Sequence, residues 1–279
     1  MRGVALLLVM GLLAVVAVGL ATLARQTSSA RRGADAVSGD LQRRWLWRSA
    51  EDVLRTAPLF AEPQPGAAGT AAPERPATRE RAFDWVFDLG HHRGRLRFAD
   101  ESAKADLNVL YPENDAGGAA LRVAQLAAES GVTTPMEPRP HRGFASPWLH
   151  FTLPGQLVQP DHIDAVYALA PPEGPPGPLD VFTLWGGGSL RASRAPESVV
   201  RATLGDGFTD IETRRVADHF AQPPAQRTPL DLELVERLAG RLTDAAGPAS
   251  VRGFLDNGRR TYSGLRVSSG PSGTLRFNW

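Results

Sequence analysis

Histidine, serine and acidic side chains are the groups in this sequence that could perform chemistry, but their spacing forms no enzyme motif. The histidines show no His-Glu-x-x-His or other zinc-binding spacing. They are His91, His92, His141, His150, His162 and His219. The adjacent pair His91 and His92 leaves a metal site as an alternative. No serine lies in a Gly-x-Ser-x-Gly sequence, but a triad can be assembled from dispersed residues. A hydrolase therefore stays open as an alternative function.

Two further segments resemble reactive sites and are explained more simply as turns. Asp100 and Glu101 are adjacent acids, a pattern that is common in solvated turns. The run Gly186–Gly188 is not followed by the Gly-Lys-Ser/Thr of a phosphate-binding loop. Cysteine is absent from the sequence, which excludes disulfides, thiolate metal sites and thiol catalysis. We expect Asp100, Ser102 and Asn108 to bond local backbone groups of a turn.

The composition is that of a folded protein with no general affinity for nucleic acid. Of 279 residues, 42% are hydrophobic and 22% are charged, an ordinary globular mixture. Basic and acidic residues nearly balance, with a net charge of +1, so no basic field invites DNA or RNA. We therefore expect no nucleic-acid partner.

The N-terminal segment has the length and apolarity of a membrane span. Val4–Ala24 carries no charge, and about 20 apolar residues are needed to cross the bilayer hydrocarbon. A cleavable secretory signal normally has a shorter apolar region behind several positive charges. A plain signal anchor remains an alternative. Apolar residues then recur every three or four positions as far as Ala57, before Pro58, which predicts one helix over Val4–Ala57.

The remaining pattern predicts an α+β head. Alternating residues over 83–98 predict a β-hairpin with its turn at His91–Gly94, and three strands are expected near the C-terminus, at Val251–Leu255, Tyr262–Val267 and Thr274–Phe277. Helices are expected at Ala119–Ala128, Asp161–Ala170, Ala195–Leu204 and Leu230–Leu242, and a further strand at Leu179–Trp185. The proline-rich stretch Pro58–Arg79 predicts a loop.

The N-terminus resembles a prepilin-type leader. A short basic stretch ends at Gly3 directly before the apolar helix, so cleavage between Gly3 and Val4 is implied. The fifth residue after that cleavage is Glu in most pilins, but here it is Leu8. A carboxylate in an apolar filament is costly without a partner, so its absence suits a tip subunit with no neighbour above it. K-type minor pseudopilins of bacterial type II secretion systems lack this Glu and often begin in a similar way.

Two internal stretches resemble the same family. Asp100–Asn108 is similar to the family's Asp-Glu-Ser-Gly-Lys-Ile-Asn-Leu-Asn, with agreement at Asp100, Glu101, Ser102, Lys104, Leu107 and Asn108. In the family this stretch marks the exit from the first sheet strands into an inserted helical domain. The second stretch agrees at Trp185, Gly186, Gly188, Leu190, Ala195, Pro196 and Glu197. Arg191, Ser193 and Arg194 replace the family's Asn, Asn and Thr there, which puts the hydrogen bonding of those amides in doubt.

The resemblance implies a pilin-like fold in which a long N-terminal helix packs on an antiparallel sheet that carries an inserted, trimmed helical subdomain. The implied parts are a leader at 1–3, a transmembrane helix at 4–24, its periplasmic half at 25–57, a loop at 58–80, the first sheet strands at 81–110, the insertion at 111–250 and the last strands at 251–279. Its implied place is the bacterial inner membrane, with a single pass and the head in the periplasm.

The implied function is assembly rather than catalysis. The resemblance implies a minor pseudopilin at the pseudopilus tip that initiates assembly and supports protein export, with no enzyme activity. The implied partners are I- and J-like minor pseudopilins, the major pseudopilin, the prepilin peptidase and the inner-membrane assembly platform. No cofactor is required, although calcium occurs in some K-type subunits, and Glu113, Asn114 and Asp115 offer hard oxygen ligands for it. The alternative is a signal-anchored periplasmic hydrolase.

Overall fold

The protein is described here from a computed structural model. It describes residues 2–56, 81–89, 92–111, 116–142, 149–170, 174–245, 247–256, 261–268 and 274–278. Only the backbone is described at 2–16, 55–56, 89, 92, 116, 141–142, 149–150, 262, 274 and 277–278. The chain divides into two compact units, residues 1–49 and 50–279. Each unit is considered by itself.

The N-terminal helix extends across the first unit and ends in the second. Helix α1 covers Arg2–Thr56, which confirms the helix expected as far as Ala57. Among the residues that the structure describes, no helix is both long enough and apolar enough to cross a membrane. The membrane span expected at Val4–Ala24 stays a prediction.

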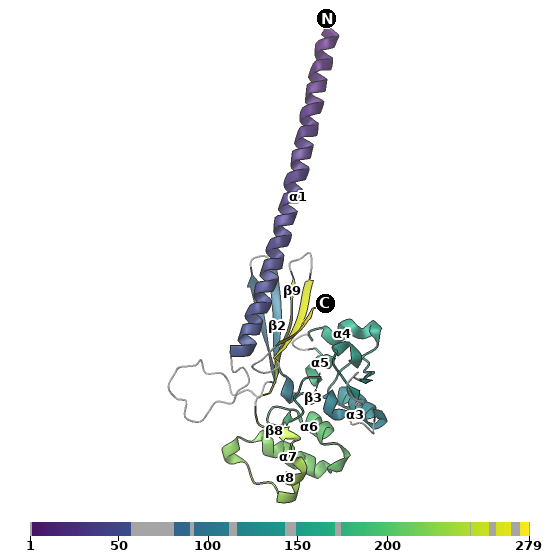
Figure 1. The fold of residues 1–279 in the computed structure, drawn as a ribbon, viewed down its shortest axis with the longest axis vertical. Coiled ribbons are helices and arrows are strands. Elements are labelled where there is room, and N and C mark those ends of the chain that lie inside the picture. The colour runs from purple at the N-terminus through teal and green to yellow at the C-terminus, as the bar shows by residue number, and fades with distance from the viewer. Residues whose placement is uncertain are drawn as a thin grey trace, which may run out of the picture. The chain divides into compact units, whose positions relative to one another are not determined.

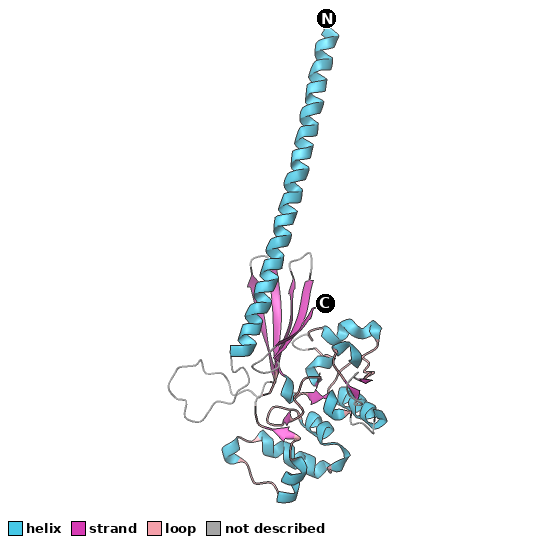
Figure 2. Ribbon diagram, in the orientation of Figure 1, coloured by secondary structure: helices cyan, strands magenta, loops and turns pink. Residues whose placement is uncertain are grey.

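The second unit is built on a five-stranded antiparallel sheet in the order β1-β2-β9-β10-β11, which Figures 1 and 2 show at the end of α1. Its strands are β1 (Ala82–Leu89), β2 (His92–Asp100), β9 (Ala249–Asp256), β10 (Thr261–Ser268) and β11 (Thr274–Asn278). The expected hairpin and the expected C-terminal meander are therefore both confirmed. The turn expected at His91–Gly94 is wrong, because β2 already begins at His92, which pairs with Leu89.

Strands β2 and β9 are neighbours in the sheet although a long segment separates them in the chain. Phe98 pairs with Val251, and Asp100 pairs with Ala249. Residues 101–248 are thus inserted between two adjacent strands, and their helices lie beyond the end of the sheet where β2 ends (Figure 1).

The insertion consists of short elements. Its helices are α2 (Leu107–Leu110), α3 (Ala116–Glu129), α4 (Ile163–Tyr167), α5 (Pro178–Val181), α6 (Glu197–Leu204), α7 (Asp210–Ala221) and α8 (Leu232–Leu238). Its strands form three two-residue pairs, β3 (Ala105–Asp106) with β6 (Phe182–Thr183), β4 (His141–Arg142) with β5 (Leu149–His150), and β7 (Leu190–Arg191) with β8 (Leu242–Thr243). Single 3-10 turns η1–η5 lie at Glu101–Ala103, Pro154–Leu157, Pro160–His162, Gly205–Gly207 and Pro224–Gln226.

The two faces of the sheet pack against different parts of the chain. Leu96, Phe98 and Val251 share one face and are fully buried. Glu51, near the end of α1, reaches the same face and binds Arg266 of β10 and Arg276 of β11. On the opposite face, Leu265 joins the hydrophobic core of the insertion. The sheet is therefore shared between α1 on one side and the insertion on the other.

The strand expected at Leu179–Trp185 is wrong in its first half. Pro178 begins α5, where its fixed φ suits a first helical position, and the Asp180 carboxylate accepts the backbone N–H of Gly177 at 2.9 Å. Only Phe182–Thr183 is extended, as β6. The capping interaction at Gly177 thus favours a helix where the apolar run predicted a strand.

Three expected helices are shorter than the pattern suggested. The helix at Leu230–Leu242 is α8 alone, since Gly240 adopts a φ of +77° soon after it. The helix at Asp161–Ala170 is reduced to a 3-10 turn followed by α4. The helix at Ala195–Leu204 begins only at Glu197, with Pro196 as its N-cap. The helix at Ala119–Ala128 is confirmed within the longer α3.

Candidate functional site

Charged side chains are buried where the chain leaves β2 for the insertion. Asp100, Glu101 and Lys104 are each no more than 4% exposed. The expectation that the two acids lie in a solvated turn is therefore wrong. A buried charge is stable only when a partner compensates it, so each of these groups points to a specific contact.

Glu101 and Lys104 form a buried ion pair that also binds the sheet. Lys104 Nζ lies 2.5 Å from Glu101 Oε1 and donates to the Leu179 carbonyl at 2.8 Å. Ser250 of β9 donates its hydroxyl to the same Glu101 oxygen at 2.5 Å. Burial lowers the pKa of Lys104, and the Glu101 carboxylate opposes that effect. The pair therefore joins the exit turn, α5 and β9.

Asp180 of α5 is the second acid at this place. Its Oδ1 lies 2.5 Å from Arg252 of β9 and 3.2 Å from Arg97 of β2. Burial alone would raise the pKa of Asp180, but the charges of Arg252, Arg97 and Lys104 hold it below its ordinary value. Arg97 also binds Asp84 of β1 at 3.0 Å. One α5 carboxylate thus connects the insertion to two sheet strands.

Asp100 joins the two stretches that resemble the pseudopilin family. Its carboxylate accepts the backbone N–H of Ser102 at 3.1 Å, as expected for a turn, and also binds Arg191 Nη1 at 3.0 Å. Both side chains of this ion pair are 1% exposed. Arg191, which replaces the family's Asn, therefore makes a buried ion pair between the two stretches.

Asp106 and Asn108 make the second connection between the stretches. The Asp106 carboxylate caps α2 through the Asn108 N–H and also accepts the backbone N–H groups of Gly186 and Gly188. Burial raises the pKa of Asp106, and these hydrogen bonds oppose that rise. Asn108 donates its side-chain amide to Leu184, at 3.1 Å, so its partners lie far away in the sequence and not in the local turn.

The other residues of the two stretches have structural environments. Leu107 is fully buried, as expected for an anchor in the core, and Leu190 is 4% exposed. Trp185 and Ala195 pack against the core of the insertion. Pro196 caps α6, and Glu197 in its first turn binds Arg201 at 2.9 Å.

Several predicted site residues lie where no side chain is described. Gly3, Val4 and Leu8 belong to α1, but only their backbone is described. The calcium candidates Glu113, Asn114 and Asp115 lie outside the described residues, as does His91. Over the described ranges, no group of three or more His, Asp or Glu side chains could hold a metal ion. The leader and calcium expectations stay predictions.

Helix α7 was not anticipated from the sequence. Its signal was the capping box Thr209-x-x-Glu212, in which the Thr209 hydroxyl accepts the Glu212 N–H at 3.2 Å and the Glu212 carboxylate accepts the Thr209 N–H at 2.7 Å. The hairpin between α6 and α7 carries Asp206, and α7 begins at Asp210. These acids would repel a phosphate backbone, so this helix pair is poorly suited to grip nucleic acid.

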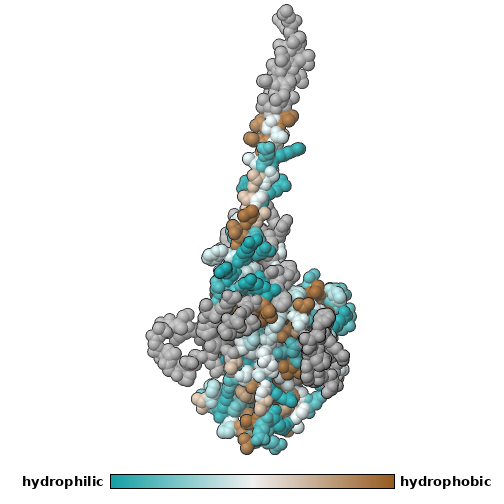
Figure 3. All heavy atoms as spheres, in the orientation of Figure 1, coloured by the Kyte–Doolittle hydropathy of each residue, from teal (hydrophilic) through white to brown (hydrophobic). Residues whose placement is uncertain are grey.

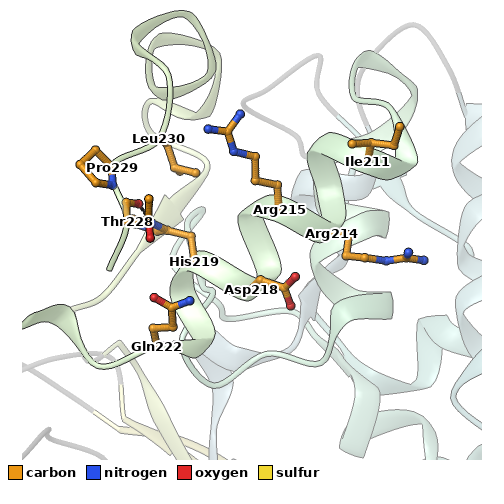
Figure 4. A pocket seen from close by; sticks show the side chains of 9 residues that line it. All are labelled: Ile211, Arg214, Arg215, Asp218, His219, Gln222, Thr228, Pro229 and Leu230. Atoms are coloured by element: carbon orange, nitrogen blue, oxygen red, sulfur yellow. Dashed lines mark hydrogen bonds between the residues drawn. The ribbon is translucent and has the colours of Figure 1, made fainter. Parts of the chain in front are cut away.

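A groove of about 370 Å³ lies between α7 and the segment before α8. In Figure 4 the Arg215, His219 and Leu230 side chains converge on it, and Ile211 stands at its other end. His219 Nδ1 is 2.8 Å from the Thr228 carbonyl, and Arg215 binds Asp231 at 2.5 Å. No serine or threonine hydroxyl is hydrogen-bonded to His219 within the described part of the chain, so the groove has no assembled nucleophile.

Comparisons with known proteins find matches among solved structures but none by sequence. No family model and no curated protein matches the sequence. A chain in the crystal structure of the GspK-GspI-GspJ complex, from the enterotoxigenic Escherichia coli type 2 secretion system, matches with a TM-score of 0.42 and 12% identity. The match covers 88% of this chain and 98% of that chain. At this TM-score it does not establish a shared fold.

Proposed function

We propose that this chain is a K-type minor pseudopilin at the tip of a type II secretion pseudopilus, where it initiates assembly and supports protein export. Its work is binding between subunits and not catalysis. The N-terminal helix is anchored in the bacterial inner membrane with the head in the periplasm, and prepilin peptidase removes residues 1–3. Its partners are I- and J-like minor pseudopilins, the major pseudopilin and the assembly platform.

The place of the Asp100–Asn108 stretch is the observation that carries this proposal. The resemblance predicted that this stretch leaves the first sheet strands and enters an inserted helical domain. Asp100 is the last residue of β2, and residues 101–248 separate β2 from its sheet neighbour β9. A turn motif in an unrelated protein has no reason to lie at such a point.

The burial of the two stretches against each other also supports the proposal. Asp100 binds Arg191, and Asp106 holds the loop that contains Gly186 and Gly188. Together these contacts fix the insertion on the sheet. Residues with such a structural role are expected to recur in proteins that share the fold. The expectation that the insertion is trimmed belongs to the same proposal.

The test is co-purification of the full chain with I- and J-like pseudopilins expressed from the same secretion system, in detergent. We expect a stable complex of the three subunits. A control with Arg215→Met, at an exposed ion pair outside the buried junction, should give the same complex. Absence of any complex with either subunit, while the purified chain remains folded, would argue against the proposal and for the anchored-hydrolase alternative.

A further inference from the structure

A cleft of about 610 Å³ opens beside the buried charges, between the start of β1 and helix α7. Arg81 and Arg97 line its sheet side, and Arg194 lies on the loop before α6. Much of the remaining wall is made of small apolar residues, among them Ala82, Ala195 and Ala217. The cleft is thus shallow-walled and basic on one side.

Arg81 is a partly buried cation on the sheet side of the cleft. Its guanidinium makes no ion pair within 4.0 Å in the described part of the chain. Burial lowers the pKa of Arg81, Arg97 lowers it further, and Asp180 alone opposes the shift. An arginine stays charged in any case, so Asp180 offsets the desolvation of Arg81 only in part.

Asp180 does not satisfy Arg81, because other cations already hold it. Arg252 and Arg97 bind the same Asp180 oxygen. The charges around this point are Arg81, Arg95, Arg97, Lys104 and Arg252 against Asp84, Glu101 and Asp180. Among these described groups, five cations and three acids leave a net positive charge. Arg81 is the cation among them that lines the cleft without an ion pair to a described residue.

The acids that line the cleft reduce this net positive charge but do not cancel it, because Asp218 adds only one further acidic group to the three. Glu197 is bound by Arg201 at 2.9 Å, and Asp218 is exposed at the rim of the cleft without an ion pair to Arg81. Figure 3 shows hydrophilic and hydrophobic residues mixed over the coloured part of the head on the face that it draws. The cleft is therefore distinguished by its charge and not by its hydrophobicity.

We propose that this cleft binds an acidic side chain of a partner polypeptide, with the carboxylate on Arg81 and the peptide backbone along the alanine-lined wall. A guanidinium presents paired N–H donors that match a carboxylate. The small residues of the wall let a peptide backbone approach. This inference does not depend on the proposed function.

The experiment uses the full chain in detergent and a fluorescent peptide, Ac-Ala-Glu-Ala-Ala, with Ac-Ala-Gln-Ala-Ala as its neutral match, in an anisotropy titration. We expect the Glu peptide to bind about tenfold more tightly than the Gln peptide, since one charge-assisted hydrogen-bonded pair distinguishes them. Arg81→Met should abolish this difference. Arg93→Met, at an exposed arginine on β2, should leave it unchanged.

Four results would overturn the inference. Equal binding of the two peptides by the wild type, or a difference that survives in Arg81→Met, would show that the cleft does not select a carboxylate through Arg81. Competition by free succinate at the concentration of the Glu peptide would show that a small dicarboxylate, and not a polypeptide, is the ligand. The thermal midpoint of Arg81→Met without peptide gives an independent measurement: it should not fall below that of the wild type, and a clear fall would show that Arg81 has a structural role instead.

Discussion

Lys104 is the only lysine of the sequence, and its ammonium holds the buried Glu101 carboxylate in place. Replacing it by methionine in Lys104→Met preserves most of the side-chain volume and leaves the carboxylate without its cation. Removing one member of a buried pair is expected to lower the free energy of unfolding by about 3–5 kcal/mol. Urea denaturation followed by tryptophan fluorescence measures it.

The control for this prediction is an exposed ion pair. Arg215→Met removes the partner of Asp231, and both side chains are about half or more exposed. The expected loss there is below about 1 kcal/mol. The double variant Glu101→Leu with Lys104→Met should recover much of the loss, because no charge is then left buried. Equal, small losses in Lys104→Met and Arg215→Met would contradict the importance of the buried junction.

At the scale of elements, α7 depends on the capping box at its N-terminus. Hydrogen bonds from Thr209 and the charge of Arg237 lower the pKa of Glu212 from 4.5 to about 2. Because the folded-state pKa lies below the unfolded value, this contribution to stability is fully present above about pH 4.5 and is lost as the pH falls towards 2. Glu212→Gln should therefore remove part of the decline in the urea midpoint between pH 4.5 and pH 2. An identical decline in wild type and variant would contradict it.

Glu51, near the end of α1, binds two strands of the sheet. Glu51 Oε1 lies 3.0 Å from Arg266, which is 6% exposed, and Arg276 binds the same carboxylate from an exposed position. Glu51→Ala would leave Arg266 buried without its anion, so the free energy of unfolding should fall by about 3 kcal/mol. Arg276→Ala removes only the exposed partner and should cost less. An equal loss in the two variants would show that Arg266 is not stabilised by Glu51.

Local patterns predicted the elements that are long and periodic. The α1 stripe, the 83–98 alternation and the three C-terminal strands depend only on residues near one another, and the structure has them. The sequence could not predict that Asp100 would meet Arg191, or that Lys104 would meet Leu179, because these partners are brought together only by the folded insertion. The missed helix α7 is different, since its capping box was visible in the sequence.

At the scale of the whole molecule, the topology assigns the two faces of the sheet to different parts of the chain. The sheet takes α1 on one face and the core of the insertion on the other, and the buried charges lie where the insertion begins. Asp180 and Glu101 bind sheet residues on β2 and β9, the two strands between which the insertion is placed. The insertion is therefore held at its base by ionic contacts as well as by apolar packing.

The proposal that this chain is a processed pseudopilin is tested most directly by the mass and N-terminal sequence of the protein from membranes that contain prepilin peptidase. We expect the wild-type chain to begin at Val4. The variant Gly3→Leu, which replaces the residue before the cleavage point, should keep its first three residues. A wild-type chain that still begins at Met1 in the presence of active peptidase would contradict the proposal.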